Sequence, residues 1–442
     1  MTTVASPRMH GRRYFIMALL FSLTVINYID RVNLSIAAPA ISKYFHWDAV
    51  TMGWVFSAYM WSYIIFQIPS GMLVDRYGSY KVASASVSLW SFATVCTGAV
   101  TGFGSMMLAR LGLGMGEASV FTIDNKVVRQ WFPSGERAFA TSIFHSGIAV
   151  AKVGTPLIAL AIVKFGWRWS FVVTAIPGFI WLLVWLKWFR QPEECSWISA
   201  DERKLILETR QGRSGAAGTT HTPLSWSSLS SIMGQKSVWG VCLAQGCMNY
   251  TGYLFMAWLP MYLMFRGMNL MKAGIMTAIP NLVGAAMEVA LGKLSDRLLT
   301  PESVRRGKRR LHIAILFVGM LLLSVIRLLD NEWALIAVIS VVLGCTFAIG
   351  ALNSSLTNDL TQDPKITGTV FGMLHFISAI FGAAAPIVTG YIVQATRGYN
   401  GAYIPATVLA LIGAVVVMTM TRQPIKATIQ LETGSATAAG KG

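Results

Sequence analysis

Long apolar stretches alternate with short polar segments along the whole chain. A helix needs about 20 mainly apolar residues to cross the hydrocarbon core of a bilayer, and stretches near or above that length recur throughout. They cover residues 14–39, 50–73, 80–100, 104–128, 139–163, 167–189, 238–263, 272–294, 311–328, 333–356, 366–394 and 400–421. The pattern predicts an all-α membrane protein with twelve transmembrane helices.

Composition and charge agree with this class of protein. Only 12% of the residues are charged, whereas soluble proteins carry about 25%. The net charge of +17 would suggest nucleic acid or acidic lipid as a partner until the basic residues are mapped. If both termini are inside, 26 of the 36 Lys and Arg residues lie on the inner side, 7 lie outside and 3 lie within the stretches. This asymmetry follows the positive-inside rule.

The charge map therefore predicts a multi-pass protein of the cell (inner) membrane with both termini cytoplasmic. Its partner is then the lipid bilayer, and no nucleic acid is expected. The densest basic cluster, at residues 305–310, becomes a determinant of topology. The cysteines have no metal-binding spacing and no nucleotide-binding loop is present, so we expect neither a metal nor another cofactor.

Two copies of a short motif indicate that the chain is an internal repeat of six stretches per half. Gly71-Met-Leu-Val-Asp75-Arg76 ends the second stretch, and Gly292-Lys-Leu-Ser-Asp296-Arg297 ends the eighth, 221 residues later. We predict six-helix bundles at 1–189 and 237–422, a cytoplasmic linker at 190–236 and a cytoplasmic tail at 423–442. Within the linker, Ser199 and Glu202 form a capping-box pattern that predicts a short surface helix.

Four ionisable residues lie inside stretches that are otherwise apolar: Asp30, Arg31, Arg110 and Glu117. Each costs roughly 2.5–3.5 kcal/mol at a helix centre, so such residues usually face one another, a water-filled cavity or a charged substrate. Asn27, Tyr28 and Arg31 share one helix face. Arg110 and Glu117 are seven residues apart, too far for a direct bond, and Asp30 lies at a depth between them.

The motifs resemble those of a known family. Gly71-x-x-x-Asp75-Arg76-x-Gly78-x-x-Lys81 resembles the cytoplasmic loop motif of the major facilitator superfamily. Asn27-Tyr28-Ile29-Asp30-Arg31-x-Asn33-Leu34, Arg110-x-x-x-Gly114-x-x-Glu117-Ala118 and Trp131-Phe132-Pro133 with Glu136-Arg137 resemble its anion:cation symporter branch. That branch contains bacterial hexuronate, galactonate and glucarate transporters and sialin. The similarity covers nearly the whole chain, apart from the termini and the segment 210–236.

The resemblance and the chemistry of the side chains together suggest roles for the charged residues. Arg31 would clamp a substrate carboxylate, because a guanidinium binds carboxylates in a bidentate way, with Tyr28 and Asn27 beside it. Asp30 and Glu117 would carry protons, and Arg110 would switch by pairing with Asp30. Glu117 has no neighbouring cation in the sequence, which favours its neutral form. An ion-pair network that only sets helix packing is the alternative.

The repeated motif would form a gate on the inner side. Gly71 would permit close helix packing, Asp75 would accept hydrogen bonds from a neighbouring helix N-terminus, and Arg76 would hold the loop inside. Asp296 and Arg297 would do the same in the second half.

Other polar residues within the stretches predict contacts with substrate. Tyr63, Gln245 and Asn125 occupy positions that match the branch, and the first two could bind a polyol or carboxylate or serve interhelical contacts. The chain departs from the branch at Ile148, Gly350 and His375, where an amide and a stacking wall are lost and an imidazole is gained. Tyr253 and Trp258 are expected to pack, and His145 and His375 to be either titrating or satisfied polar groups.

Lys152 and Glu288 add two further charges within the stretches. They could form a latch between the halves, or Lys152 could contact a second carboxylate of the substrate or extend toward the membrane surface. Lys152 lies about 10 Å deeper than Glu288 by residue counting, which disfavours direct contact.

The sequence thus predicts a proton-coupled symporter that imports a small organic anion by alternating access and is not an enzyme. A sugar acid such as a hexuronate, aldonate or aldarate is the first choice. A non-sugar mono- or dicarboxylate is the alternative, as is a uniporter or exchanger of the same fold. A membrane sensor would need an output domain, and an intramembrane enzyme would need a catalytic constellation that is not evident. We expect the protein to function as a monomer.

Overall fold

A computed structural model describes residues 11–133, 136–214, 231–300, 302–303, 308–361 and 364–426. The regular structure of these residues is helical, apart from an isolated bridge between Thr361 and Ile425. Each of the twelve predicted stretches falls within described helices, although several helix boundaries differ from the prediction. Residues 215–230 of the predicted linker, 427–442 of the predicted tail and 304–307 of the basic cluster lie outside the described residues.

The first half contains helices α1 (Arg13–Phe45), α2 (Ala49–Gly98), α3 (Phe103–Glu117), α4 (Val120–Trp131), α5 (Arg137–Val153), α6 (Thr155–Phe165) and α7 (Trp167–Trp188). The fourth predicted stretch is therefore divided between α3 and α4. The fifth is divided between α5 and α6, which meet at an angle of 43°.

One helix, α2, contains both the second and the third stretch. Gly78 interrupts it with φ of 81°, a conformation that glycine adopts without the steric penalty of a side chain. The start of α2 follows the end of α1 closely in the chain. The end of α2 lies there too, because Arg168 donates to the Gly98 carbonyl and also covers the Tyr44 ring near the end of α1. The chain therefore folds back on itself at Gly78, as two separate stretches require.

The predicted surface helix of the linker is α8 (Ala200–Ser214). The Ser199 hydroxyl accepts a hydrogen bond from the backbone N–H of Glu202, at 3.2 Å, which confirms the predicted start. The Glu202 side chain does not complete a capping box. It accepts from the backbone N–H of Arg13, at 3.1 Å, and thereby holds α8 against the start of α1.

The second half contains α10 (Lys236–Phe265), α11 (Leu270–Leu298), α13 (Arg309–Met320), the 3₁₀ helix η1 (Leu321–Leu328), α14 (Glu332–Leu360), α15 (Pro364–Thr396) and α16 (Tyr403–Met420). The ninth stretch is α13 continued by η1. Among the described helices, eight are individually long and apolar enough to cross a membrane, and the bent pair α5–α6 adds a ninth.

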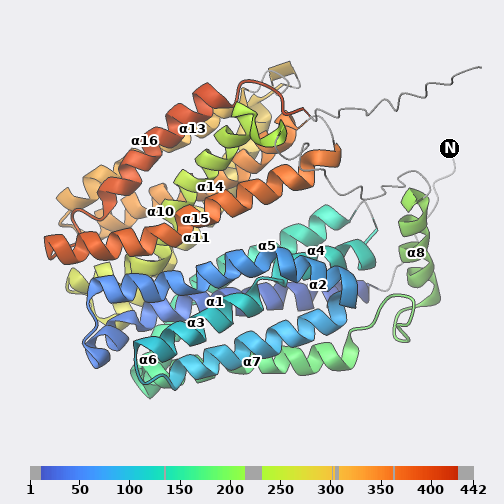
Figure 1. Ribbon diagram of the computed structural model, residues 1–442, viewed down its shortest axis with the longest axis horizontal. Coiled ribbons are helices and arrows are strands. Elements are labelled where there is room, and N and C mark those ends of the chain that lie inside the picture. The colour runs from blue at the N-terminus through green and yellow to red at the C-terminus, as the bar shows by residue number, and fades with distance from the viewer. Residues whose placement is uncertain are drawn as a thin grey trace, which may run out of the picture.

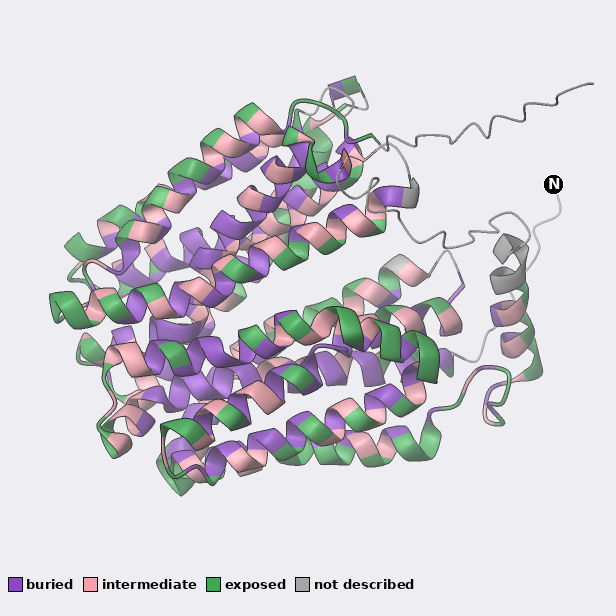
Figure 2. Ribbon diagram, viewed as in Figure 1, coloured by how far each residue is buried: buried purple, intermediate pink, exposed green. Residues whose placement is uncertain are grey.

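Large apolar side chains cover the outside of the bundles. Leu157, Leu183 and Ile315 are among those more than half exposed. Figure 2 shows buried positions concentrated on the inward-facing sides of the helices, with exposed positions along their outer sides. Soluble monomers rarely expose contiguous apolar area of this kind, so the outer surface is suited to lipid.

The two halves form separate bundles that converge at one end and diverge toward the other (Figure 1). We call the end at which α8 and residues 11 and 426 lie the terminal end, and the opposite end the far end. Among the described residues, the hydrogen bonds that join the halves include Val50 to Gln394, Ser57 to Ala383 and Thr155 to Gly274. The residues that make them lie in the far-end parts of their helices, so the halves are closed together there.

Candidate functional site

The centre of the first half holds a buried ion pair. Arg31 of α1 donates from Nε to the Glu117 carboxylate at the end of α3, at 2.6 Å, and both side chains are almost fully buried. This contact corrects the prediction that Glu117 has no neighbouring cation. Sequence position could not reveal it, because the two residues are 86 positions apart and meet only through helix packing.

Aromatic rings surround the Arg31 guanidinium. Its central carbon lies 4.7 Å from the ring centre of Tyr28, 5.0 Å from Tyr63 and 5.4 Å from Tyr59. The predicted shared face of Tyr28 and Arg31 is therefore confirmed. Tyr59 was missed, although it lies four residues before Tyr63 on the same face of α2, and it also lies under Arg110, at 5.6 Å.

Several buried polar atoms of this cluster have no hydrogen-bond partner among the described residues. They include Arg31 Nη2, Arg110 Nε and Glu117 Oε1, together with both amide atoms of Asn27. Leaving such an atom buried and unsatisfied costs about 1–3 kcal/mol, and more when the group is charged. The two guanidinium donors among these atoms, Arg31 Nη2 and Arg110 Nε, could donate hydrogen bonds to a bound carboxylate.

Asp30 does not form the ion pair with Arg110 that the sequence predicted. No bond between them is within 4 Å in this structure, and neither Asp30 oxygen has a hydrogen-bond partner in the part of the chain that it describes. Asp30 instead lies near the hydroxyl groups of Thr94 and Thr174, within the electrostatic reach of Arg110 and Glu117. The pairing between Asp30 and Arg110 was predicted for one state of the transport cycle, and it is not formed in the present conformation.

A buried acid that the sequence analysis overlooked is Asp124 in α4. Its side chain has no exposed surface, and one of its oxygens accepts from the Thr24 hydroxyl at 3.3 Å. It lies within the fourth apolar stretch, so the same search that found Glu117 should have found it. The nearby Asn125, by contrast, is exposed and donates to the Phe121 carbonyl.

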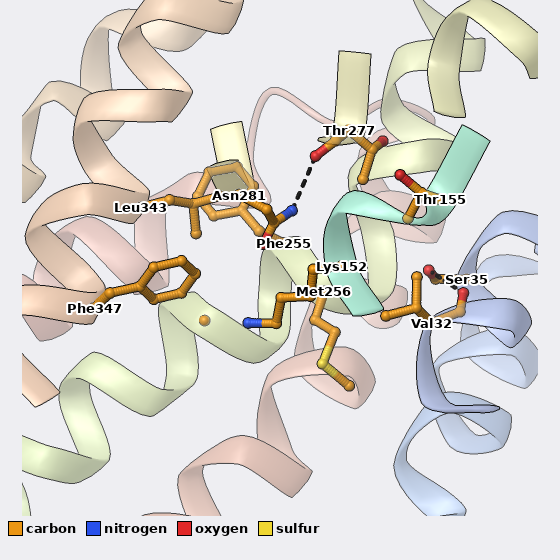
Figure 3. Close-up of a pocket in the computed structure, with 11 residues that line it drawn as sticks. Val32, Ser35, Lys152, Thr155, Phe255, Met256, Thr277, Asn281, Leu343 and Phe347 are labelled. Atoms are coloured by element: carbon orange, nitrogen blue, oxygen red, sulfur yellow. Dashed lines mark hydrogen bonds between the residues drawn. The ribbon is translucent and has the colours of Figure 1, made fainter. Parts of the chain in front are cut away.

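Two pockets adjoin the cluster between the halves. One has Arg31, Arg110 and Tyr59 in its lining. The other is lined by Lys152 and by residues of α1, α6, α10, α11 and α14 (Figure 3). Ser35 and Met256 line both pockets, so the two are neighbours.

The remaining predicted contacts lie apart from this cluster. Gln245 of α10 accepts from the Asn353 amide of α14, at 2.9 Å, and is thus held within the second half. His375 of α15 is exposed and lies close enough to His145 of α5 for their charges to interact. Neither Gln245 nor His375 lines the two pockets described above. Met248 lies against Gly350, where the stacking wall was judged to be lost.

The repeated motifs lie at the terminal end and pair with cations of their own halves. Asp75 accepts from the Lys126 ammonium of α4, at 3.0 Å, and so does not cap a helix N-terminus as predicted. An added Cβ at Gly71 would meet nothing within 4 Å, which corrects the prediction of close packing there. Arg76 is exposed.

The second copy forms a larger network. Arg309, at the start of α13, donates to Asp296 at 2.7 Å and to Asp359 of α14 at 2.8 Å. It therefore ties three helices of the second half together, while Arg297 is exposed.

Comparisons with known proteins agree with this architecture. A family model described as Major Facilitator Superfamily matches residues 20–386. The chain is 33% identical over 409 residues to the probable galactarate/D-glucarate transporter GudP of Bacillus subtilis, which covers 89% of this chain and 88% of that protein. It is 30% identical over 412 residues to a probable L-galactonate transporter of Escherichia coli, covering 92% of this chain and 89% of that protein.

Among solved structures, the chain resembles a bacterial homolog of the human lysosomal transporter Spinster in an inward-facing and unoccupied conformation. The TM-score is 0.75 at 17% identity, and the match covers 95% of this chain and 98% of that one. At that identity the likeness shows the fold.

Proposed function

The chain belongs to the major facilitator superfamily, and from this premise we propose that it imports a sugar acid together with a proton by alternating access. The observation that carries the proposal is the buried Arg31–Glu117 pair, where Arg31 Nη2 and the neighbouring Arg110 Nε have no acceptor among the described residues. The names of its relatives, which include transporters of galactarate, D-glucarate, L-galactonate and hexuronate, support a sugar acid as the substrate.

Competition for Arg31 couples the substrate to the proton. A substrate carboxylate that approaches Arg31 takes the place of Glu117, whose carboxylate then remains buried without its cation. An unpaired buried charge is strongly unfavourable, so Glu117 takes up a proton as the substrate binds. Release of the substrate returns Arg31 to Glu117 and expels the proton.

Charge balance favours this sequence of events. Arg31, Arg110, Asp30 and Glu117 form a buried set with two positive and two negative groups. A monoanion and one proton added together leave the total charge of that set unchanged, and a dianion does so together with two protons. The loaded and the empty carrier then have the same net charge, and reorientation carries no additional penalty for moving charge through a low-dielectric region.

In the transport cycle, the site opens alternately at the two ends of the molecule, one on each side of the membrane. The positive-inside rule makes the terminal end cytoplasmic. Because the halves are bonded together at the far end, the present conformation is the inward-facing one of the cycle. Rocking of the bundles about the central cluster would open the far end instead.

The test uses the purified carrier in proteoliposomes with galactarate, L-galactonate and hexuronate as substrates. Glu117→Gln mimics the protonated acid, so it should still exchange substrate in counterflow at equal pH. It should lose accumulation driven by an acidic exterior, because no proton can leave at the inner side. The control is Glu208→Gln, an acid on the exposed surface of α8, which should accumulate substrate like the wild type.

If Glu117→Gln concentrates substrate under the pH gradient as the wild type does, Glu117 is not the coupling residue. If the wild type itself shows no response to the gradient but exchanges substrate, the protein is a uniporter or exchanger. If it transports none of the three substrates, the assignment to sugar acids fails.

A further inference from the structure

We propose that the pocket around Lys152 binds a second carboxylate, so that this carrier selects six-carbon sugar diacids over the corresponding monoacids. The inference rests on the proposed function and specifies its substrate. One carboxylate of the diacid would bind at Arg31 and the other at Lys152, and the hydroxyl-bearing carbons would lie between the two cations.

Lys152 is placed as a binding residue would be. It lies in α5 within a membrane-spanning stretch, and its ammonium group reaches across the pocket to lie 4.5 Å from the ring centre of Phe347 in α14. Figure 3 shows the side chain lying among Phe347, Phe255 and Met256 at the pocket wall. A lysine ammonium group within a membrane-spanning stretch is unfavourable unless an anion joins it.

The other polar groups of the pocket are suited to a sugar rather than to an anion. The hydroxyls of Ser35, Thr155 and Thr277 each donate their proton to a backbone carbonyl, at 2.9, 2.9 and 2.7 Å. A hydroxyl has one donor and two acceptor positions, so these three present only acceptors to a ligand. They can accept from the hydroxyls of a polyol, but they would repel a carboxylate.

Asn281 can contribute both an acceptor and a donor. Its amide nitrogen donates one hydrogen to the Thr277 carbonyl at 2.9 Å, drawn as a dashed line in Figure 3, which leaves the amide oxygen and the second N–H for a hydroxyl group of the ligand. Among the groups that line this pocket, Lys152 is the cation, with three donors to offer. A carboxylate in this pocket therefore binds at Lys152.

A structural partner does not account for Lys152. Glu288 in α11 is close enough to Lys152 for their charges to interact. The two make no ion pair within 4 Å in the part of the chain that the structure describes, and Glu288 does not line the pocket. The latch between Lys152 and Glu288 is thus not formed in this conformation.

The two cations are arranged for one ligand. The Arg31 pocket and the Lys152 pocket share Ser35 and Met256, and the charges of Arg31 and Lys152 are close enough to act on each other. A diacid that bridges them would neutralise this repulsion. A monoacid would leave the partly buried Lys152 without an anion, which gives the preference its physical basis.

The test compares two ligands that differ at one terminus. Galactarate carries carboxylates at both ends of a six-carbon chain, and L-galactonate carries a carboxylate at one end and a hydroxymethyl group at the other. Binding to purified carrier is measured by calorimetry. We expect the wild type to bind galactarate at least tenfold more tightly than L-galactonate. Lys152→Gln should weaken galactarate at least tenfold and change L-galactonate less than threefold.

Three further variants sharpen the result. Lys152→Arg keeps the charge and should retain the preference for galactarate. Lys164→Gln, a lysine exposed at the end of α6, should bind both ligands like the wild type. Glu288→Gln should leave the ratio of the two affinities unchanged, whereas a latch would make it behave like Lys152→Gln.

Equal loss of both ligands in a folded Lys152→Gln carrier, or no loss of galactarate, would overturn the inference. So would a wild type that binds the two ligands equally well, although the proposed transport of sugar acids would then stand. A wild type that binds neither ligand would instead count against the proposed function.

Discussion

Arg31 is the residue on which both binding and coupling depend. It forms the ion pair with Glu117, lies among three tyrosine rings and has a buried donor, Nη2, with no partner in the part of the chain that the structure describes. The planar fork of a guanidinium binds a carboxylate in a bidentate way, which allows a substrate carboxylate to replace Glu117 on Arg31. Lysine carries the same charge but offers it from a single point.

Replacement of Arg31 by lysine tests whether substrate binding depends on the geometry of the guanidinium or only on its charge. Arg31→Lys should weaken binding of the identified sugar acid at least tenfold, or about 1.4 kcal/mol, because the planar fork is lost while the charge remains. Calorimetric titration of the purified variant provides the measurement, with Arg327→Lys, an exposed arginine of η1, as the matched control. Unchanged binding in Arg31→Ala would show that Arg31 does not hold the substrate.

The residues of the site could be found from the sequence, but their partners could not. Asp30, Arg31, Arg110 and Glu117 are conspicuous as charges in apolar stretches, and helical spacing brings Tyr28 beside Arg31. Which residues of two helices pair depends on how each helix is rotated about its axis and on how deep each residue lies in the membrane. Counting residues from the end of a stretch gives that depth only to within about one helical turn. That is why Glu117 was expected without a cation, although Arg31 lies against it.

The two copies of the repeated motif show how identical sequence spacing leads to different contacts. Asp75 meets Lys126 in the first half, whereas Asp296 meets Arg309, which also binds Asp359, in the second. Asp75 is 82% exposed and its pair joins helices of one half. An exposed ion pair contributes about 0–1 kcal/mol to stability, so the role of Asp75 is better sought in the equilibrium between conformations.

Asp75→Asn should impair transport and leave substrate binding within a few-fold of the wild type. The terminal end, where Asp75 lies, is about half the length of a spanning helix from Arg31, so substrate contact is not expected. Uptake into proteoliposomes and calorimetric binding are measured on the same preparation. Asp330→Asn, at the far end, serves as the control. A loss of binding as large as that of Arg31→Ala would contradict a gating role.

The breaks in helices were also beyond the sequence analysis. The fourth stretch divides at Ala118–Ser119, next to Glu117, and the fifth divides at Gly154, next to Lys152. Neither site contains the proline that usually marks a break in a helix, although Pro156 follows Gly154 closely. The proposed coupling residue Glu117 and the proposed binding residue Lys152 thus lie within two residues of a break, where a helix can change direction without disturbing the rest of its bundle.

The twelve apolar stretches, the repeat and the fold class follow from patterns that extend over many residues, so the sequence predicts them well. The conformational state does not, because one sequence must support at least two arrangements of its halves. In this structure the contacts between α2 and α15 at the far end select one of them. Gly53 lies against the Pro386 carbonyl and Gly390 against the Ala49 carbonyl, with no room for a side chain at either position.

Closure of the far end therefore depends on glycine, and a methyl group should oppose it. An added Cβ at Gly390 would lie 2.4 Å from the Ala49 carbonyl oxygen, so Gly390→Ala must push α2 and α15 apart. Overpacking of this kind costs about 1–3 kcal/mol, which corresponds to a shift of roughly 5- to 150-fold toward the conformation that is open at the far end. Gly372→Ala is the matched control in the same helix, because a Cβ there meets nothing within 4 Å.

Spin labels at Tyr77 and Leu298 report the distance between the halves. Both positions are exposed and lie at the terminal end of the molecule, Tyr77 beside the interruption of α2 at Gly78 and Leu298 at the end of α11. Pulsed dipolar spectroscopy of the carrier in lipid should show a larger population of short distances in Gly390→Ala than in the wild type or Gly372→Ala. The terminal end closes when the far end opens, because the bundles rock as rigid bodies. Identical distance distributions in all three proteins would mean that the far-end contact between α2 and α15 does not control the equilibrium.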